Sequence, residues 1–323
     1  MSDPSTEMLA RMYYTMGLIR DFENKAAELF TRGILAKGGV HSSVGQEAVA
    51  TGVGLSLRGD DWISSTHRGH GHHLAKGADP RRLMAELLAK DAGYCRGRGG
   101  SMHVAAFEIG SLGAYAMVGE GVPIAVGAAL AEKMKGTDRV AVPFLGDGAL
   151  GQGVVHESFN LASVWRLPVV FAVERNGIAV STRCDQMVAP STRLAELAQA
   201  YGLRYYGVDG QDVLAVHDAA GRAVAAARSG QGPALLDCRT YRFEGHYASE
   251  PQVYRRREEI DEMRRTQDPI AHFEAYLLDS GLFSTADLEA LRRRSAEVVE
   301  DAAEFAQTSP EPDPSTYAEY VYA

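Results

Sequence analysis

The sequence contains few cysteines for its length. Only 3 of its 323 residues are Cys, and Cys95, Cys184 and Cys238 lie far apart, outside any CxxC spacing. An odd number of widely spaced cysteines argues against a disulfide framework, and the missing CxxC pairs argue against a structural zinc site. This cysteine usage predicts a protein of a reducing compartment.

The sequence also lacks an excess of basic residues and any long apolar run. Its formal net charge is −9, which argues against binding nucleic acid through electrostatic attraction. No apolar stretch is long enough to span a membrane. The N-terminus, "MSDPSTEMLARMYY", has acid and proline where a secretion signal needs a basic start and an apolar run. We therefore expect a soluble, cytoplasmic protein.

One stretch of the chain predicts parallel β-structure. Residues 138–145 and 167–174 are apolar enough for buried strands, and residues 153–165 between them have the pattern of a helix. A strand–helix–strand unit of this length has parallel strands and a right-handed crossover. A helix near 212–228 and a strand within 232–243 extend the pattern. The predicted fold class is α/β, with a largely parallel sheet flanked by helices.

The remaining segments are predicted with less regular structure or as an extension. Residues 94–119 are so rich in glycine that we expect loops. We expect an α/β domain over residues 1–253 and a helical C-terminal extension over residues 254–323. Within the extension, Ser284 and Asp287 resemble a capping box before a helix to about residue 306. The aromatic tail, "TYAEYVYA", is predicted to dock on a partner chain.

Two polar residues follow the two strands of the predicted unit. Asp147, in "GDG", comes directly after the first strand, and Asn176, in "RNG", comes after the second. Since ligands of parallel sheets bind beyond the carboxyl ends of the strands, both residues are expected at one edge. Carboxylate and amide oxygens suit Mg²⁺ or Ca²⁺, and Gly146 and Gly148 permit a tight turn beside a bulky anion. The pattern predicts a site for a metal-bound diphosphate.

A dinucleotide-binding loop is the competing interpretation of this stretch. Residues 146–151, "GDGALG", fit the G-x-G-x-x-G pattern. That pattern expects an acidic residue about 20 positions further on, at the end of the next strand. Glu174 comes too late for that role, and Asn176 beside it suits a metal better. A nicotinamide-dependent oxidoreductase stays open as an alternative.

The motifs together resemble a known family. "VHSSVGQEAVATGV", "STHRGHGHHLAKG", "GRGGSMH", "VGEGVPIAVGAAL", the GDG…N pair and "TYRFEGHY" follow one another from about residue 8 to residue 310. In order and spacing they are similar to the α subunit of the thiamine diphosphate-dependent E1 component of 2-oxoacid dehydrogenase complexes. "STHRGHGH" and "RFEGHY" look most like the acetoin dehydrogenase branch. The resemblance implies the thiamine diphosphate-binding fold and an oxidoreductase acting on an oxo group.

The resemblance implies a role for each matching residue. Asp147, the side chain of Asn176 and the backbone carbonyl of Ile178 would hold Mg²⁺. His41 and His246 would be catalytic residues near the cofactor. The residues implied to bind thiamine diphosphate are His41, His67, Arg68, Ala116, Val118, Asp147, Gly148, Ala149, Asn176, Ile178 and His246.

Several positions depart from the family pattern. Arg175 stands where many relatives have an asparagine, but the asparagine assigned to the metal is kept. Tyr115, Ala116 and Glu120 change the surroundings of the cofactor ring, so the substrate stays open among acetoin, pyruvate and branched 2-oxoacids. Tyr247 replaces a regulatory serine of mammalian relatives, so control by phosphorylation there is not expected.

Other histidines and aromatic residues have simpler interpretations. "HRGHGHH" has no carboxylate or cysteine nearby, so we expect a phosphate-facing loop and not a metal cluster. His72 and His73 are predicted as surface or packing residues. Phe159 and Trp165 are predicted on the buried face of the helix at 153–165.

The resemblance also implies partners. In the family, a β subunit supplies the glutamate at the pyrimidine ring of the cofactor, and no residue of this chain replaces it convincingly. We expect an α₂β₂ heterotetramer that passes an acyl unit to a lipoyl-bearing E2. The other interpretations left open are a thiamine diphosphate-dependent carboligase subunit and a cofactor-binding regulatory subunit without turnover.

Overall fold

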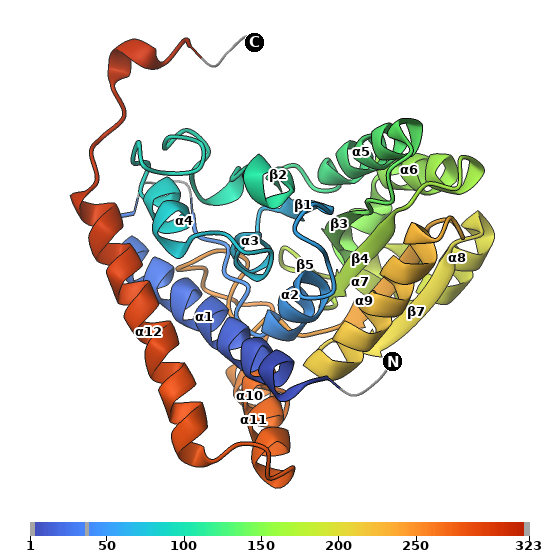
Figure 1. Cartoon of the computed structure of the whole chain (residues 1–323). Helices are drawn as coiled ribbons and strands as arrows, with labels where there is room; N and C mark the ends of the chain where they lie inside the picture. The colour runs from blue at the N-terminus through green and yellow to red at the C-terminus, as the bar shows by residue number, and fades with distance from the viewer. Residues whose placement is uncertain (1–3, 36–38, 320–323) are drawn as a thin grey trace.

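A six-stranded parallel sheet forms the centre of the protein, in a computed structural model that describes residues 4–35 and 39–319 (Figure 1). The strand order is β2-β1-β3-β4-β8-β7, and every neighbouring pair is parallel. The strands are β1 (Trp62–Thr66), β2 (Ser111–Tyr115), β3 (Ala141–Gly146), β4 (Val170–Arg175), β7 (Arg204–Asp209) and β8 (Ala234–Arg239). A separate antiparallel pair joins β5 (Ile178–Ala179) to β6 (Thr182–Arg183). The predicted α/β class with a parallel sheet is confirmed.

Helices cover both faces of the sheet. Phe171 and Val173 of β4 pack in one core cluster with α5 (Gly121–Lys135), α6 (Gly153–Val164) and α8 (Leu194–Tyr201). Val170 and Ala172, which point to the other face, pack with α2 (Glu47–Gly54) and α9 (Val213–Arg228). Strands buried on both faces need apolar residues at successive positions. This explains the continuous apolar runs in the sequence.

A second helical layer joins the two ends of the chain. The apolar faces of α1 (Thr6–Thr31), α4 (Pro80–Leu87) and α12 (Thr285–Thr308) share one buried cluster that includes Phe22, Leu83 and Val299. In Figure 1, α1 and α12 run side by side. The other α-helices are α3 (His70–Ala75), α7 (Cys184–Met187), α10 (Arg257–Thr266) and α11 (Pro269–Asp279). Short 3₁₀ helices are η1 (Gly100–Met102), η2 (Phe107–Ile109), η3 (Asp147–Gly151), η4 (Ala189–Thr192) and η5 (Pro314–Thr316).

The start of α12 confirms the predicted capping box. The Ser284 hydroxyl accepts the Asp287 N–H at 3.2 Å, and the Asp287 carboxylate accepts the Ser284 N–H at 2.9 Å. The helix continues to Thr308, slightly beyond the predicted end. Of the aromatic tail, residues 320–323 lie outside the described residues, and the side chain of Tyr317 is exposed.

Two predictions about local structure are wrong. Residues 94–119 are not all loops, because β2 forms within them and pairs with β1. Gly113 takes a φ of +134° inside β2, and a register shift interrupts the pairing, so tertiary pairing here overrides a glycine-rich local sequence. Trp165 is 43% exposed, whereas Phe159 is fully buried as predicted. Trp165 follows the last helical residue, Val164, and so leaves the buried face of α6.

A single buried carboxylate orders the glycine-rich loop after α4. The Glu86 side chain is fully buried and accepts backbone N–H groups from Cys95, Gly97, Gly99 and Gly100, at 2.7 to 3.1 Å. Four N–H donors compensate for removing this charge from water. The predicted loop is therefore held in one conformation.

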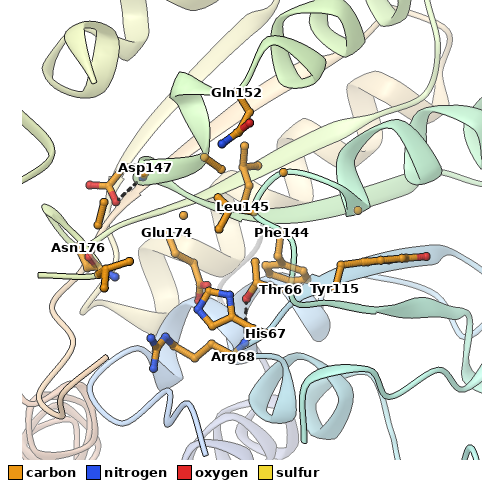
Figure 2. A pocket seen from close by; sticks show the side chains of 18 of the residues that line it. Thr66, His67, Arg68, Tyr115, Phe144, Leu145, Asp147, Gln152, Glu174 and Asn176 are labelled. Atoms are coloured by element: carbon orange, nitrogen blue, oxygen red, sulfur yellow. Dashed lines mark hydrogen bonds between the residues drawn. The ribbon is translucent and has the colours of Figure 1, made fainter. Parts of the chain in front are cut away.

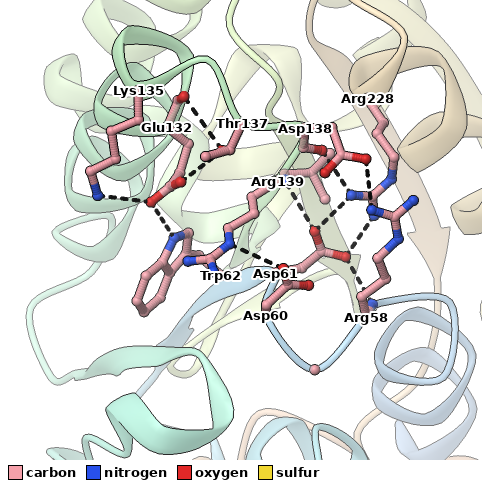
Figure 3. Close-up of polar contacts among 12 residues, drawn as sticks. Arg58, Asp60, Asp61, Trp62, Glu132, Lys135, Thr137, Asp138, Arg139 and Arg228 are labelled. Atoms are coloured by element: carbon pink, nitrogen blue, oxygen red, sulfur yellow. Dashed lines mark hydrogen bonds and ion pairs between the residues drawn. The ribbon is translucent and has the colours of Figure 1, made fainter.

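A network of charged residues lies at the edge of the sheet where β1 and β3 begin (Figure 3). The fully buried Asp61 carboxylate accepts hydrogen bonds from both terminal nitrogens of Arg228, at 3.1 and 2.7 Å. It also accepts the backbone N–H groups of Arg58 and Val140, at 2.8 and 3.0 Å. Asp61 thereby ties the start of β1 to the end of α9 and to the segment before β3.

Asp61→Asn is expected to lower the free energy of unfolding by about 2 kcal/mol, because an amide cannot accept all four hydrogen bonds and leaves Arg228 without its counter-ion. The matched control is Asp60→Asn. Asp60 pairs with Arg139 at 3.1 Å, but its side chain is 49% exposed, so the control should lose less than about 1 kcal/mol. Urea unfolding measures both. Equal losses for the two variants would contradict the role given to Asp61.

In the parts of the chain that the structure describes, no helix combines the length and apolar character needed to cross a bilayer.

Candidate functional site

A cavity of about 190 Å³ opens at the carboxyl edge of β1, β3 and β4. Figure 2 shows Asp147 and Asn176 at one end of it, His67 and Arg68 along one side, and Tyr115 at the other end. This is the edge at which parallel sheets bind their ligands. Asp147 and Asn176, which were predicted to lie at one edge of the sheet, therefore both line a cavity there.

Asp147 and Asn176 follow adjacent strands, β3 and β4, as predicted. The buried Asp147 carboxylate accepts the N–H of Gly148 at 3.1 Å and that of Gly177 at 2.8 Å. Burial raises the pKa of Asp147, and these two N–H groups oppose the rise. Within residues 4–35 and 39–319, no basic side chain forms an ion pair with Asp147. A buried carboxylate beside an amide oxygen, facing a cavity, suits a hard cation such as Mg²⁺.

The glycines around Asp147 leave room on its cavity side. A Cβ on Gly148 would lie 2.7 Å from the Cβ of Ala179, so the turn packs tightly against β5. A Cβ on Gly146 would meet no protein atom within 4 Å. After the turn, η3 precedes α6, so its backbone N–H groups open a helical segment next to the cavity. This geometry suits an anion at the start of the helix.

Three histidines from distant segments meet at the cavity. The ring centroid of His41 lies 4.8 Å from that of His67 and 5.0 Å from that of His246, and both ring pairs are edge to face. The pKa is lowered to about 3 for His41, about 2 for His67 and about 4 for His246. The main cause is burial of the rings, and the second is the positive charge of Arg68. All three rings are therefore neutral near pH 7. Among the described residues, no partner bonds the buried Nδ1 of His41.

Two positively charged guanidinium groups lie beside this histidine cluster and favour an anion over a metal ion. Arg68 and Arg242 approach Nδ1 of His246 at 3.5 and 3.4 Å. Their positive charges repel a metal ion, although the ring nitrogens of the three histidines lie within 4.8 Å of one another. The same charges favour an anion with several oxygens, such as a diphosphate.

Arg68 is buried without a carboxylate of its own. Its guanidinium donates to the carbonyl oxygens of Ser42 and, at 3.1 Å, of His246. No acidic side chain of the described residues lies within ion-pair distance of it. Burial and the nearby Arg242 lower the pKa of Arg68 to about 9, so the group stays charged at neutral pH. A buried, uncompensated charge of this kind is stabilised by a bound anion.

The structure brings most of the predicted site residues to the cavity. Those that line it are His67, Arg68, Val118, Asp147, Gly148, Ala149, Asn176, Ile178 and His246. His41 does not line it but contacts the rings of His67 and His246. Ala116 lies between two lining residues, Tyr115 and Met117, without lining the cavity itself. The structure therefore supports a role at the cavity less directly for Ala116 than for the other predicted residues.

Sequence reasoning missed several polar residues that line the cavity, among them Gln46, Glu174 and Arg242. Arg242 is 3% exposed and donates to the Tyr254 hydroxyl at 2.9 Å. Its place four residues before His246, in "RFEGH", was an available signal. Glu174 accepts a hydrogen bond from Nε2 of His72 at 3.2 Å. Because this carboxylate is already engaged inside the core, it is poorly suited to bind a ribose, which weakens the dinucleotide interpretation.

The other histidines of "HRGHGHH" serve the core. His70 lies between Glu23 and Ser101, at 3.0 and 2.9 Å. The ring of His72 stacks on Phe144, with centroids 3.7 Å apart, and Nδ1 of His73 donates to the Gly69 carbonyl at 2.7 Å. The predicted packing role of His72 and His73 is confirmed, and the surface alternative is wrong because both are buried.

Comparisons with known proteins agree with these motifs. The family model described as Dehydrogenase E1 component matches residues 14–315. The α subunit of acetoin:2,6-dichlorophenolindophenol oxidoreductase of Bacillus subtilis is 45% identical over 96% of this chain and 92% of its own length. The same subunit of Cupriavidus necator is 42% identical, over 98% and 94%. The pyruvate dehydrogenase E1 component α subunit of Rhizobium meliloti is 41% identical, over 94% and 87%. The chain belongs to the dehydrogenase E1 component family.

Proposed function

We propose that this chain is the α subunit of a thiamine diphosphate- and Mg²⁺-dependent E1 dehydrogenase. In this proposal it oxidatively cleaves acetoin, or decarboxylates a 2-oxoacid such as pyruvate, and the acyl unit passes to a lipoyl-bearing E2. One observation carries the proposal. The buried Asp147 carboxylate and the half-buried Asn176 amide share a cavity with an uncompensated guanidinium, Arg68. The neutral histidines His67 and His246 line the same cavity, and His41 packs against both rings. A cation and a diphosphate together would satisfy both groups.

The residues divide between the metal and the diphosphate. Asp147, the Asn176 side chain and the Ile178 carbonyl would hold Mg²⁺. Backbone groups of Ala116 and Val118 would contact the ring. The residues that would contact the diphosphate are Gly148, Ala149, His41, His67, Arg68 and His246. When bound, the cofactor supplies the electron sink for the carbonyl chemistry.

His246 has a defined tautomer in this arrangement. Both neighbours of its Nδ1, Arg68 and Arg242, can only donate hydrogen bonds. Nδ1 of the neutral ring must therefore accept, and Nε2 carries the proton. His246 can thus offer an Nε2–H donor to an oxygen of the substrate, which is the basis for its proposed catalytic role, with His41 packed against its ring.

An apolar rim beside the cavity supports a second subunit. Met117 is 70% exposed, Val118 44%, Val180 53% and Met187 54%, and all four line the cavity mouth. Exposed apolar side chains grouped around a polar site are typical of a protein interface. The named relatives are α subunits. We place a β subunit on this rim, in an α₂β₂ assembly in the cytoplasm.

The test combines this chain with the product of its neighbouring gene, Mg²⁺ and thiamine diphosphate. Reduction of an artificial dye is followed with acetoin, pyruvate and branched 2-oxoacids. We expect turnover of acetoin that requires both chains, because the relatives named for acetoin are 45% and 42% identical, against 41% for the Rhizobium meliloti relative named for pyruvate. Turnover by this chain alone would contradict the two-subunit proposal. Carbon–carbon bond formation without transfer to lipoamide would indicate a carboligase, and binding of NAD without metal would indicate the dinucleotide interpretation.

A further inference from the structure

Gln46 holds the side chain of Asn176 from a distant part of the chain. The Gln46 side chain is 1% exposed and lies at the N-cap of α2, beside the cavity. Its Oε1 accepts a hydrogen bond from Nδ2 of Asn176 at 3.0 Å. Neither the motifs nor the proposed function gives this glutamine a role.

The backbone around Gln46 is fixed on both sides. The N–H of Gln46 donates to the Ser43 carbonyl at 2.9 Å. Gly45 has a φ of +99°, and a Cβ there would lie 2.4 Å from the Tyr241 carbonyl oxygen. On the other side, the fully buried Glu47 carboxylate pairs with Arg20. The glutamine therefore reaches Asn176 from a rigid support and not from a mobile loop.

The amide of Asn176 has one donor end and one acceptor end, and only the acceptor end can ligate a cation. Gln46 engages Nδ2, while Oδ1 accepts the Ile178 N–H at 3.0 Å. A carbonyl oxygen has two acceptor positions, so Oδ1 keeps one for a metal ion. If the amide turned over, its NH₂ would face the Ile178 N–H, and Gln46 Oε1 would face a second oxygen.

We propose that Gln46 is a positioning residue that orients Asn176 so that Oδ1 faces the metal. This inference rests on the proposed function, in which Asn176 is a metal ligand. Partners that orient metal ligands in this way typically account for roughly 10–100-fold in metal affinity.

The test measures how much Mg²⁺ is needed for thiamine diphosphate binding, by calorimetry on the full chain purified with its β subunit. Gln46→Leu should raise the half-saturating Mg²⁺ concentration about tenfold or more. Gln46→Glu keeps an acceptor for Nδ2 and should stay within about threefold of the wild type. The matched control is Gln211→Leu. Gln211 is 4% exposed and is bonded to Thr240 at 2.7 Å, but it does not line the cavity, so the Mg²⁺ requirement should not change.

The outcomes separate this inference from the proposed function. If wild-type protein binds thiamine diphosphate equally well without Mg²⁺, the proposed function fails, and the inference fails with it. If the wild type needs Mg²⁺ but Gln46→Leu has the same requirement, only the inference fails. An equal loss in Gln46→Leu, Gln46→Glu and Gln211→Leu would show a general packing effect and would also overturn it.

Discussion

Asp147→Ala is expected to weaken Mg²⁺-dependent binding of thiamine diphosphate on the order of 1,000-fold, because removing one member of a buried charge pair costs about 3–5 kcal/mol. Asp147 is the only anionic side chain assigned to the metal. Without it, the Asn176 amide and a backbone carbonyl would face a divalent cation with no negative charge. Binding of the metal and binding of the diphosphate should therefore be lost together.

The same substitution should have little effect on the protein without cofactor. Asp147 has no counter-ion among the described residues, and burial raises its pKa, so the ionised side chain contributes little to the stability of the protein when no cofactor is added. Calorimetry with thiamine diphosphate measures binding, and thermal unfolding without ligands checks the fold. Asp185→Ala is the control, because Asp185 pairs with the exposed Arg183 and does not line the cavity. Near-normal binding by Asp147→Ala at low Mg²⁺ would contradict the metal site.

Arg68→Leu is expected to change binding and stability in opposite directions. Loss of a charged hydrogen-bonding group should weaken cofactor binding by about 2–3 kcal/mol. Without cofactor, the variant should unfold at a temperature at least as high as the wild type. The reason is that burial and Arg242 already disfavour the charge of Arg68, as the lowered pKa of about 9 indicates.

Arg228→Leu supplies the contrast to Arg68→Leu. Arg228 is less deeply buried than Arg68, at 14% side-chain exposure, and it is paired with Asp61. Its loss should lower the unfolding temperature and leave cofactor binding unchanged. Calorimetry and thermal unfolding of both variants test the pair. A destabilised Arg68→Leu variant with normal affinity would remove Arg68 from the diphosphate site.

The elements with strong local signals could be predicted from the sequence. β3 and β4 were predictable because strands buried on both faces have continuous apolar runs. α6 was predictable because the sequence between these two runs has the spacing of apolar residues typical of a helix. The placement of Asp147 and Asn176 followed from the geometry of parallel strands. The capping box at Ser284 was predictable because it depends on contacts between residues three apart.

Features that depend on distant contacts were not predictable. β7 is an exposed edge strand with polar residues, and β2 contains a glycine in the left-handed region, so neither has a clear strand pattern. The contact between Gln46 and Asn176 arises only when segments far apart in sequence fold together. The division of the chain at residue 253 stays a prediction.

The pairing of α1 with α12 has a consequence for synthesis of the protein. Phe22 of α1 shares a buried cluster with Val299 of α12, which is synthesised much later than α1. At about 5–20 residues per second, translation takes on the order of ten seconds or more to reach α12. During that time the apolar stripe of α1 has no partner from α12. Until α12 emerges, the apolar stripe of α1 in the nascent chain is therefore a surface to which a chaperone can bind.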